Sequence, residues 1–262
     1  MRLDVFLTER GLAPSRQRAK LLIESGCVLL NGKAVEKPSA PASESDKIEI
    51  IGEPLAYVSR GALKLERAFE AFSLSAADRT AIDVGASTGG FTEYLLLQGA
   101  AHVYAVDSGS GQLAEKLRRD VRVVSMEKYN ARFLSPTDFP VRPTFAVMDV
   151  SFISQTLILP ALYSVLDARA ILVSLVKPQF EAGREAIGKG GVVKSRAARA
   201  GAIARVVEAA KACGFAFCGV TPSPILGGDG NEEFLACFSK GGERPAVENE
   251  AQSIARAAGV QC

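Results

Sequence analysis

Two aspartates lie where a nucleotide-like ligand could be held. Asp83 ends a β-branched run that starts at Thr80, and Asp107 ends the next apolar run. The turn Gly85-Ala-Ser-Thr-Gly89-Gly90 leads from the first run into a new helical pattern. Small residues allow the backbone to approach a ligand closely, and α/β folds bind nucleotides at the carboxyl ends of their strands. The segment that ends at Thr92 therefore predicts the ligand site of an α/β domain.

The glycine spacing argues against one class of ligand. Dinucleotide-binding domains use Gly-x-Gly-x-x-Gly to place a pyrophosphate on a helix N-terminus, and this turn does not follow that pattern. A carboxylate two residues before Gly85 suits a cationic amino-acid group, and Asp107 can accept hydrogen bonds from ribose hydroxyls. S-adenosylmethionine carries both groups, so we expect it as the cofactor. Each aspartate could instead cap a helix or a turn.

Two lysines and two further carboxylates lie at the ends or flanks of expected elements. Asp149 and Lys177 each follow a uniformly apolar run, Glu233 precedes the last one, and Lys64 lies beside the apolar stripe of a helix. A single charge at an element end is usually solvated, but the carboxyl ends of parallel strands meet around one crevice. Such a set can deprotonate a ribose 2′-hydroxyl while a methyl group moves in line to the oxygen. We predict that Lys177 is the base, that Asp149 orients it, and that Glu233 positions Lys64 or the ribose.

Other methyl acceptors fit the sequence less well. Methylation of an exocyclic amine commonly uses an Asn/Asp-Pro-Pro-aromatic run, whereas Asp149 is followed by Val-Ser-Phe. Methylation of cytosine C5 needs a thiolate, and no cysteine lies between Cys27 and Cys213. Phe152 and Phe180 could stack on a flipped nucleotide or pack within the protein, and both interpretations stay open.

The apolar runs that must position these residues alternate with helical patterns. They predict an α/β, Rossmann-like doubly wound sheet with an antiparallel hairpin at its edge. The expected strands are 80–84, 102–107, 121–124, 145–150, 170–176, 215–220 and 233–238, and the expected helices include 90–98, 112–118 and 195–213. The Gly-rich stretch 181–191 predicts a mobile loop over the site.

The first fifty residues show a different pattern. Two short helical segments are followed by strand segments on both sides of Asn31-Gly32, which suits a tight hairpin turn, and by an alternating run at 47–51. We expect a small N-terminal α+β domain at 1–51, a linker at 52–58, the large domain at 59–240 and a partly helical tail at 241–262.

Positive charge is concentrated locally in this small domain. The formal net charge is only +2, but no acidic residue lies between Gly11 and Leu22. A local basic cluster predicts contact with RNA phosphates, although an ordinary solvated helix face would have the same composition. The cluster consists of Arg10, Arg16, Arg18 and Lys20.

Composition limits the remaining possibilities. The five cysteines lack metal-ligand spacing, so we expect no metal site, reduced thiols and a cytoplasmic location. The longest apolar run, 170–176, is too short to cross a bilayer, so no stable membrane association is expected.

The motifs resemble known families. Residues 1–50 resemble the RNA-binding domain named after the fourth protein of the small ribosomal subunit, residues 57–240 resemble FtsJ-type ribose methyltransferases (class I methyltransferases), and the whole chain resembles the TlyA family. The motifs that carry the second resemblance are Ser59-Arg-Gly-Ala-Leu-Lys-Leu, Asp83-Val-Gly-Ala-Ser-Thr-Gly-Gly-Phe-Thr, Met148-Asp-Val-Ser-Phe, Val176-Lys-Pro-Gln-Phe-Glu, Gly188-Lys-Gly-Gly-Val-Val and Gly230-Asn-Glu-Glu-Phe.

The resemblance implies specific site residues and partners. The family's catalytic Lys-Asp-Lys-Glu tetrad would be Lys64, Asp149, Lys177 and Glu233. Its cofactor residues would be Asp83, Gly85, Ser87, Gly89, Gly90, Phe91, Thr92 and Asp107, with Asn130 and Ala131 at the adenine. The substrates implied are cytidine 2′-hydroxyls of ribosomal RNA in ribosomal subunits. A non-catalytic assembly factor is the alternative; haemolysis, also ascribed to this family, has no support from a spanning or strongly amphipathic basic segment.

Overall fold

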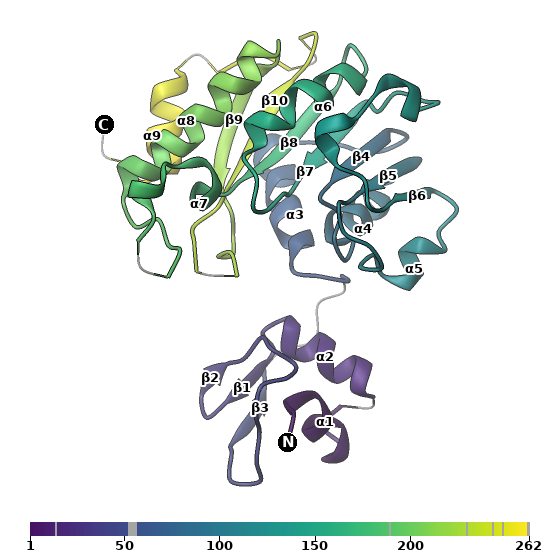
Figure 1. Ribbon diagram of the computed structural model, residues 1–262, viewed down its shortest axis with the longest axis vertical. Coiled ribbons are helices and arrows are strands. Elements are labelled where there is room, and N and C mark those ends of the chain that lie inside the picture. The colour runs from purple at the N-terminus through teal and green to yellow at the C-terminus, as the bar shows by residue number, and fades with distance from the viewer. Residues whose placement is uncertain are drawn as a thin grey trace. The chain divides into compact units, whose positions relative to one another are not determined.

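The computed structural model describes residues 1–13, 15–51, 57–188, 190–228, 230–242, 244–247 and 249–260. The chain divides into two compact units, Met1–Arg60 and Gly61–Cys262, shown in Figure 1. Residues 52–56 of the expected linker lie outside the described residues. The two units have separate hydrophobic cores.

The small unit packs two helices against a short sheet. Its core includes Leu3, Leu7 and Ile23, which are fully buried. Asn31 and Gly32 have φ values of 54° and 78°, the left-handed backbone that a two-residue hairpin turn requires. The predicted hairpin at Asn31-Gly32 is therefore present. The elements are α1 (Leu3–Glu9), α2 (Arg16–Glu24), β1 (Val28–Leu30), β2 (Lys33–Ala34) and β3 (Ile48–Ile50), with β1 in the middle of the sheet.

A mostly parallel sheet forms the centre of the large unit. Its described strands follow the order β6-β5-β4-β7-β8-β10-β9. All neighbours from β6 to β8 are parallel, whereas β10 is antiparallel to both β8 and β9. The doubly wound sheet and the antiparallel hairpin are thus confirmed. The strands are β4 (Thr80–Val84), β5 (His102–Val106), β6 (Val123–Met126), β7 (Phe145–Met148), β8 (Ile171–Val176), β9 (Ala216–Pro222) and β10 (Phe234–Ser239).

Helices cover both faces of this sheet (Figure 1). One face packs against α6, α8 and α9, which contribute Leu162, Ile203 and Ile254 to the main core. The other face packs against α3 and α4, which contact each other. The helices are α3 (Gly61–Phe72), α4 (Gly90–Leu97), α5 (Glu115–Arg118), α6 (Leu159–Val165), α7 (Pro178–Glu181), α8 (Arg196–Ala212) and α9 (Glu250–Ala257).

Helices α6 and α7 are missing from the predicted elements, whereas α9 falls in the segment 241–262, which is expected to be partly helical. Helix α6 is short, starts next to Pro160 and has no side-chain cap, so its sequence carries little helical signal. Helix α9 lies in the segment expected as a tail, and it packs against β9 and α8 as part of the large unit. No described helix is both long and apolar enough to cross a membrane.

Candidate active site

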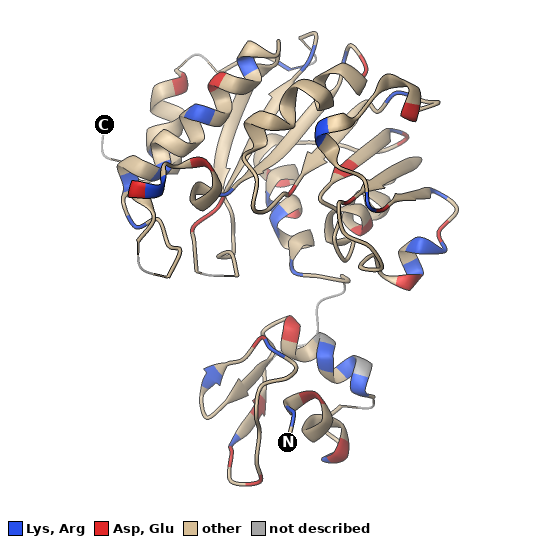
Figure 2. Ribbon diagram, in the orientation of Figure 1, with Lys and Arg blue, Asp and Glu red and all other residues tan. Residues whose placement is uncertain are grey.

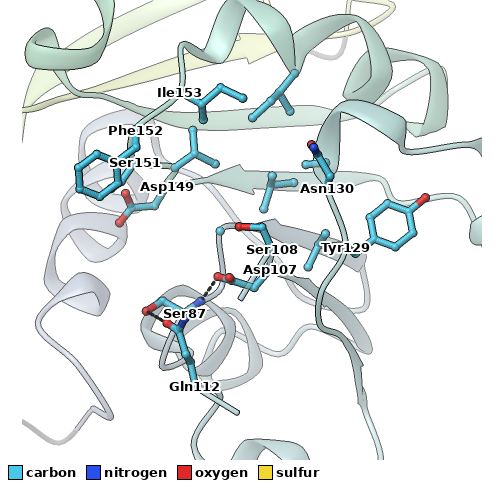
Figure 3. Close-up of a pocket in the computed structure, with 16 residues that line it drawn as sticks. Ser87, Asp107, Ser108, Gln112, Tyr129, Asn130, Asp149, Ser151, Phe152 and Ile153 are labelled. Atoms are coloured by element: carbon cyan, nitrogen blue, oxygen red, sulfur yellow. Dashed lines mark hydrogen bonds between the residues drawn. The ribbon is translucent and has the colours of Figure 1, made fainter. Parts of the chain in front are cut away.

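A cavity of about 440 Å³ lies at the carboxyl ends of β4, β5 and β7. Figure 3 shows the residues that line it, which come from the ends of these strands, from the loops after them and from the segment after β6. Of the residues predicted to bind the cofactor, those in its wall are Gly85, Ser87, Asp107, Asn130 and Ala131. The others lie in β4, at the N-cap of α4, or in the first turn of that helix.

The turn after β4 needs its glycines. Gly85 has a φ of 88°, and an added Cβ would lie 2.2 Å from the backbone oxygen of Asp149. Gly89 has a φ of 98°, and its added Cβ would lie 2.2 Å from a methyl group of Leu117. Both positions therefore exclude a side chain on conformational and steric grounds.

Asp83 is fully buried and only half satisfied. Its Oδ2 accepts a hydrogen bond from Oγ1 of Thr92 at 2.7 Å. Its Oδ1 is buried and has no hydrogen-bond partner among the described residues. Burial, together with the nearby charge of Asp149, raises the pKa of Asp83 to about 7. A cationic group beside Oδ1 would satisfy this atom and stabilise the carboxylate.

Asp107 is held by the backbone around it. It accepts hydrogen bonds from the N–H groups of Ser87 at 2.8 Å and Gly109 at 2.7 Å. Each of its carboxylate oxygens retains acceptor capacity, so Asp107 can still receive hydrogen bonds from two neighbouring hydroxyls. Figure 3 shows it directed at the cavity next to Ser87.

The far wall of the cavity is more apolar. Ala131 and Ile158 line it together with Asn130 and Tyr129. The Tyr129 hydroxyl donates to the Asp138 carboxylate at 2.6 Å, and this bond raises the pKa of Tyr129 to about 12. The Tyr129–Asp138 bond fixes the segment that carries Asn130, leaving a flat, partly apolar wall suited to an aromatic base.

The four predicted catalytic residues form two ion pairs. Nζ of Lys64 donates to Oε2 of Glu233 at 2.6 Å, and both side chains are almost fully buried. Nζ of Lys177 lies 2.5 Å from Oδ1 of Asp149. The second contact is an ion pair outside hydrogen-bond geometry, and Asp149 Oδ1 makes no hydrogen bond to a described residue.

Strand pairing brings the two ion pairs to one edge. Phe234 pairs with Val176 in the antiparallel ladder, so the preceding Glu233 lies across from Lys177. Asp149 follows β7, the parallel neighbour of β8. Glu233 comes before its strand because β10 runs in the opposite direction to β7 and β8.

One contact of Lys177 is missing from the sequence prediction. Nζ of Lys177 also donates to the Ser151 hydroxyl at 2.8 Å. The only sequence signal for this contact is the position of Ser151 two residues after Asp149. Whether its hydroxyl reaches the lysine depends on the turn after β7, which a single sequence does not reveal.

Phe152, in the same turn, is highly exposed. It has a φ of 62° and 93% of its surface is accessible. Its ring centroid lies 5.3 Å from that of Phe180. The two rings therefore contact each other beside the ion pairs, and Phe152 leaves most of its surface open.

The predicted RNA-binding residues of the small unit differ in their surroundings. Arg16 lies 3.0 Å from the fully buried Asp4, and Arg10 forms an ion pair with Glu44 at 2.8 Å. Arg18 and Lys20 are exposed and form no ion pair with a described residue. In Figure 2 the ribbon of α2 is coloured blue over much of its length by its basic residues.

The doubly wound sheet and a ligand cavity at its carboxyl edge define the class: a Rossmann-like fold shared with S-adenosylmethionine-dependent methyltransferases. A Listeria monocytogenes methyltransferase of this type has the same fold, with 15% identity, a TM-score of 0.50, and coverage of 69% of this chain and 99% of that one. Residues 57–240 match the FtsJ-like methyltransferase family, and residues 1–48 match the S4 domain.

Similar proteins indicate which family within the FtsJ-like methyltransferases the chain belongs to. The Mycobacterium tuberculosis protein named 16S/23S rRNA (cytidine-2'-O)-methyltransferase TlyA is 46% identical over 235 residues, covering 89% of this chain and 88% of that protein. A solved structure of a candidate hemolysin from Streptococcus thermophilus is 45% identical, with a TM-score of 0.77 and coverage of 98% of this chain and 95% of that one. The chain belongs to the FtsJ-like methyltransferases and, within them, to the TlyA family.

Proposed function

We propose that this chain is an S-adenosylmethionine-dependent methyltransferase that modifies the 2′-hydroxyl of a cytidine ribose in ribosomal RNA. The observation that carries the proposal is the pair of lysine–carboxylate contacts at the strand ends beside the cavity. Membership of the TlyA family and the 46% identity to a ribosomal RNA cytidine-2'-O-methyltransferase support the substrate.

The cavity fits the cofactor. The unsatisfied Oδ1 of Asp83 suits the ammonium of its amino-acid end, Asp107 suits its ribose hydroxyls, and the wall at Asn130 and Ala131 suits its adenine. Gly85 keeps the backbone open where the ligand approaches. When bound, S-adenosylmethionine supplies a methyl group on a positively charged sulfur.

The residues of this chain remove one proton from the substrate. Lys177, in its neutral amine form, would accept the proton of the ribose 2′-hydroxyl at Nζ, while that oxygen takes the methyl group and the sulfur–methyl bond breaks. Asp149 and Ser151 hold the position of this nitrogen. Lys64, held by Glu233, places a positive charge at the same edge, where it stabilises the developing negative charge on oxygen.

The small unit supplies RNA affinity in this proposal. Arg18 and Lys20 are exposed and pair with no carboxylate among the described residues, so they are the residues that we expect to contact phosphates. Because its substrate is ribosomal RNA, we place the protein in the cytoplasm.

Replacing Lys177 tests the mechanism. We expect Lys177→Ala to lower kcat for methyl transfer by roughly 10²- to 10⁴-fold, the usual contribution of a general base. Transfer of a radioactive methyl group to ribosomal subunits measures this loss. Calorimetry should show that S-adenosylmethionine binding changes by less than about threefold, because the lysine lies outside the cavity wall.

A matched control is Lys211→Ala on α8, where the lysine only forms exposed ion pairs with Glu208 and Glu250. Full activity of Lys177→Ala would disprove the proposed base. If the unmodified protein bound no S-adenosylmethionine even with RNA present, the alternative of a non-catalytic assembly factor would hold.

A further inference from the structure

The segment that follows β7 carries Asp149 and Ser151. It forms contacts with Lys177 and, at its other end, with further residues of the domain. It runs from the end of β7 to a 3₁₀ helix at Gln155–Leu157. Its first part contacts Lys177 through Asp149 and Ser151. Its last two residues, Ser154 and the first helix residue Gln155, contact the chain on both sides of Lys177.

The contact on the later side is a buried carboxylate. Glu181, at the end of α7, accepts hydrogen bonds from the Ser154 hydroxyl at 2.6 Å and from the Gln155 N–H at 2.8 Å. Only 2% of Glu181 is exposed, and burial raises the pKa of its carboxyl. Two well-aligned donors are the compensation that a buried carboxylate needs.

The contact on the earlier side is an amide. Nε2 of Gln155 donates to the backbone oxygen of Leu175 at 2.5 Å, and its Oε1 accepts from the Ser174 hydroxyl at 2.6 Å. Gln155 and Ser174 are 1% and 0% exposed. Ser174 and Leu175 belong to β8 and come three and two residues before Lys177.

These bonds close a ring around Lys177. Before the lysine, Ser174 and Leu175 of β8 bond to the 149–155 segment. After the lysine, Glu181 of α7 bonds to the same segment. The segment contacts the lysine itself through Asp149 and Ser151. Because Gln155, Ser174 and Glu181 are almost fully buried, breaking one of their bonds leaves an unsatisfied group and allows the segment to shift. A shift of about 1 Å at a reacting group can cost roughly 10²-fold in rate.

We propose that Glu181 and Gln155 are positioning residues, which hold the 149–155 segment so that Asp149 and Ser151 fix the Nζ of Lys177. The inference rests on the proposed function, in which Lys177 is the base. Glu181 and Gln155 act through this segment and make no contact of their own with the lysine nitrogen among the described residues.

The test is a comparison of kcat with both Michaelis constants. We expect Glu181→Ala to lower kcat for methylation of ribosomal subunits about 10- to 100-fold, while the KM values for RNA and S-adenosylmethionine change by less than about threefold. Glu181→Gln, which retains one acceptor oxygen, should recover part of the rate. Ser154→Ala, which removes a single donor and little volume, should cause a smaller loss and serves if Glu181→Ala does not fold.

A double-mutant cycle distinguishes positioning from general support of the fold. If Glu181 acts through Ser151, then Glu181→Ala should lower kcat less in the Ser151→Ala protein than in the unmodified protein. We expect the two fold-decreases in kcat to differ by at least about fivefold. Equal effects in the two backgrounds would overturn the inference. Glu208→Gln, which removes an exposed carboxylate from α8, is the control and should leave kcat unchanged.

The outcomes separate this inference from the proposed function. If Lys177→Ala is inactive while Glu181→Ala and Ser154→Ala keep full kcat, the positioning role is wrong and the proposed function stands. If Lys177→Ala is active, the proposed base is wrong, and the positioning role fails with it.

Discussion

Asp83 combines a buried position with an unsatisfied oxygen. Burial raises its pKa from the ordinary 3.8 to about 7, so the folded chain holds a proton there that the unfolded chain releases. Between these two values the unfolded state binds fewer protons, and stability therefore falls as the pH rises. The cofactor-free protein is destabilised by this group above pH 7, and a bound cation offsets that effect.

Asp83→Asn should therefore raise the stability of the cofactor-free protein and weaken the binding of S-adenosylmethionine. At pH 8 the cofactor-free variant should have a higher free energy of unfolding than the unmodified protein, by about 1 kcal/mol or more, and at about pH 3, below both pKa values, the two should be nearly equal. Urea unfolding at both pH values measures this difference. Calorimetry should show about 10- to 100-fold weaker S-adenosylmethionine binding, since the amide loses the charge-assisted bond.

The control is Asp78→Asn. Asp78 is exposed and has a φ of 58°, which asparagine tolerates equally well. An Asp83→Asn protein that is less stable than the unmodified protein at pH 8 would contradict the role assigned to burial.

Single residues differ in how far the sequence reveals their contacts. Asp149, Lys177 and Glu233 are candidates by residue type and by their positions at strand ends, which share one edge of the sheet. Lys64 is a candidate because it lies beside the apolar stripe of helix α3. Which lysine meets which carboxylate is not evident, since Lys64 and Glu233 are 169 positions apart and only the strand order brings them together. The contact from Lys177 to Ser151 depends on turn geometry, for which residue type is a weak guide.

At the scale of elements, the side-chain amide of Asn231 links the loop before β10 to the loop at 191–193. Asn231 is 1% exposed; its Oδ1 accepts from the Val193 N–H at 2.9 Å, and its Nδ2 donates to the Gly191 backbone oxygen at 3.0 Å. The described part of the predicted mobile loop is thus fixed at Gly191 to the segment that presents Glu233.

Asn231→Ala should release this connection. We expect faster amide hydrogen exchange at 190–193 and a free energy of unfolding lower by about 1 to 3 kcal/mol, because the buried Val193 N–H loses its acceptor. Asn231→Asp, which keeps an acceptor for Val193 but places an oxygen against Gly191, should give an intermediate effect. Unchanged exchange at 190–193 in Asn231→Ala would show that the amide does not anchor the loop.

The strands were predictable because each is a short β-branched or apolar run between polar turns, as in 171–176. Their neighbours were only partly predictable. Periodicity indicates a hairpin for the last two strands, but it does not reveal that β10 lies inside the sheet between β8 and β9. Helix α6 was not predicted because seven residues beginning beside Pro160 give too short a pattern.

At the scale of the whole molecule, the two units divide the work that we propose. In the small unit Asp4 is fully buried, and the guanidinium of Arg2 holds its pKa well below the ordinary value, with help from Arg16. Arg16 therefore stabilises the unit, while Arg18 and Lys20 remain available to RNA.

Reversing the two free charges should weaken RNA binding without harming the chemistry. For Arg18→Glu with Lys20→Glu, we expect weaker binding to ribosomal subunits and a salt dependence reduced by about two counterions. At saturating RNA, kcat should be unchanged. Filter binding over a range of salt concentrations measures the affinity and its slope.

A charge-matched control reverses Arg119 and Lys211, which form exposed ion pairs in the large unit. If this control lost as much affinity as the α2 variant, net charge and not the small unit would account for binding. Arg16→Ala should instead lower the stability of the small unit, because it removes one of the partners of Asp4.

Because β10 is the last described strand in the chain but lies inside the sheet, the large sheet is completed late in synthesis. Lys64 leaves the ribosome 169 positions before its partner Glu233, which corresponds to roughly 10 to 30 s of translation. Until β10 has entered the sheet, β8 and β9 lack their shared neighbour. A chain that ends before Glu233 lacks both the partner of Lys64 and the strand that joins β8 to β9.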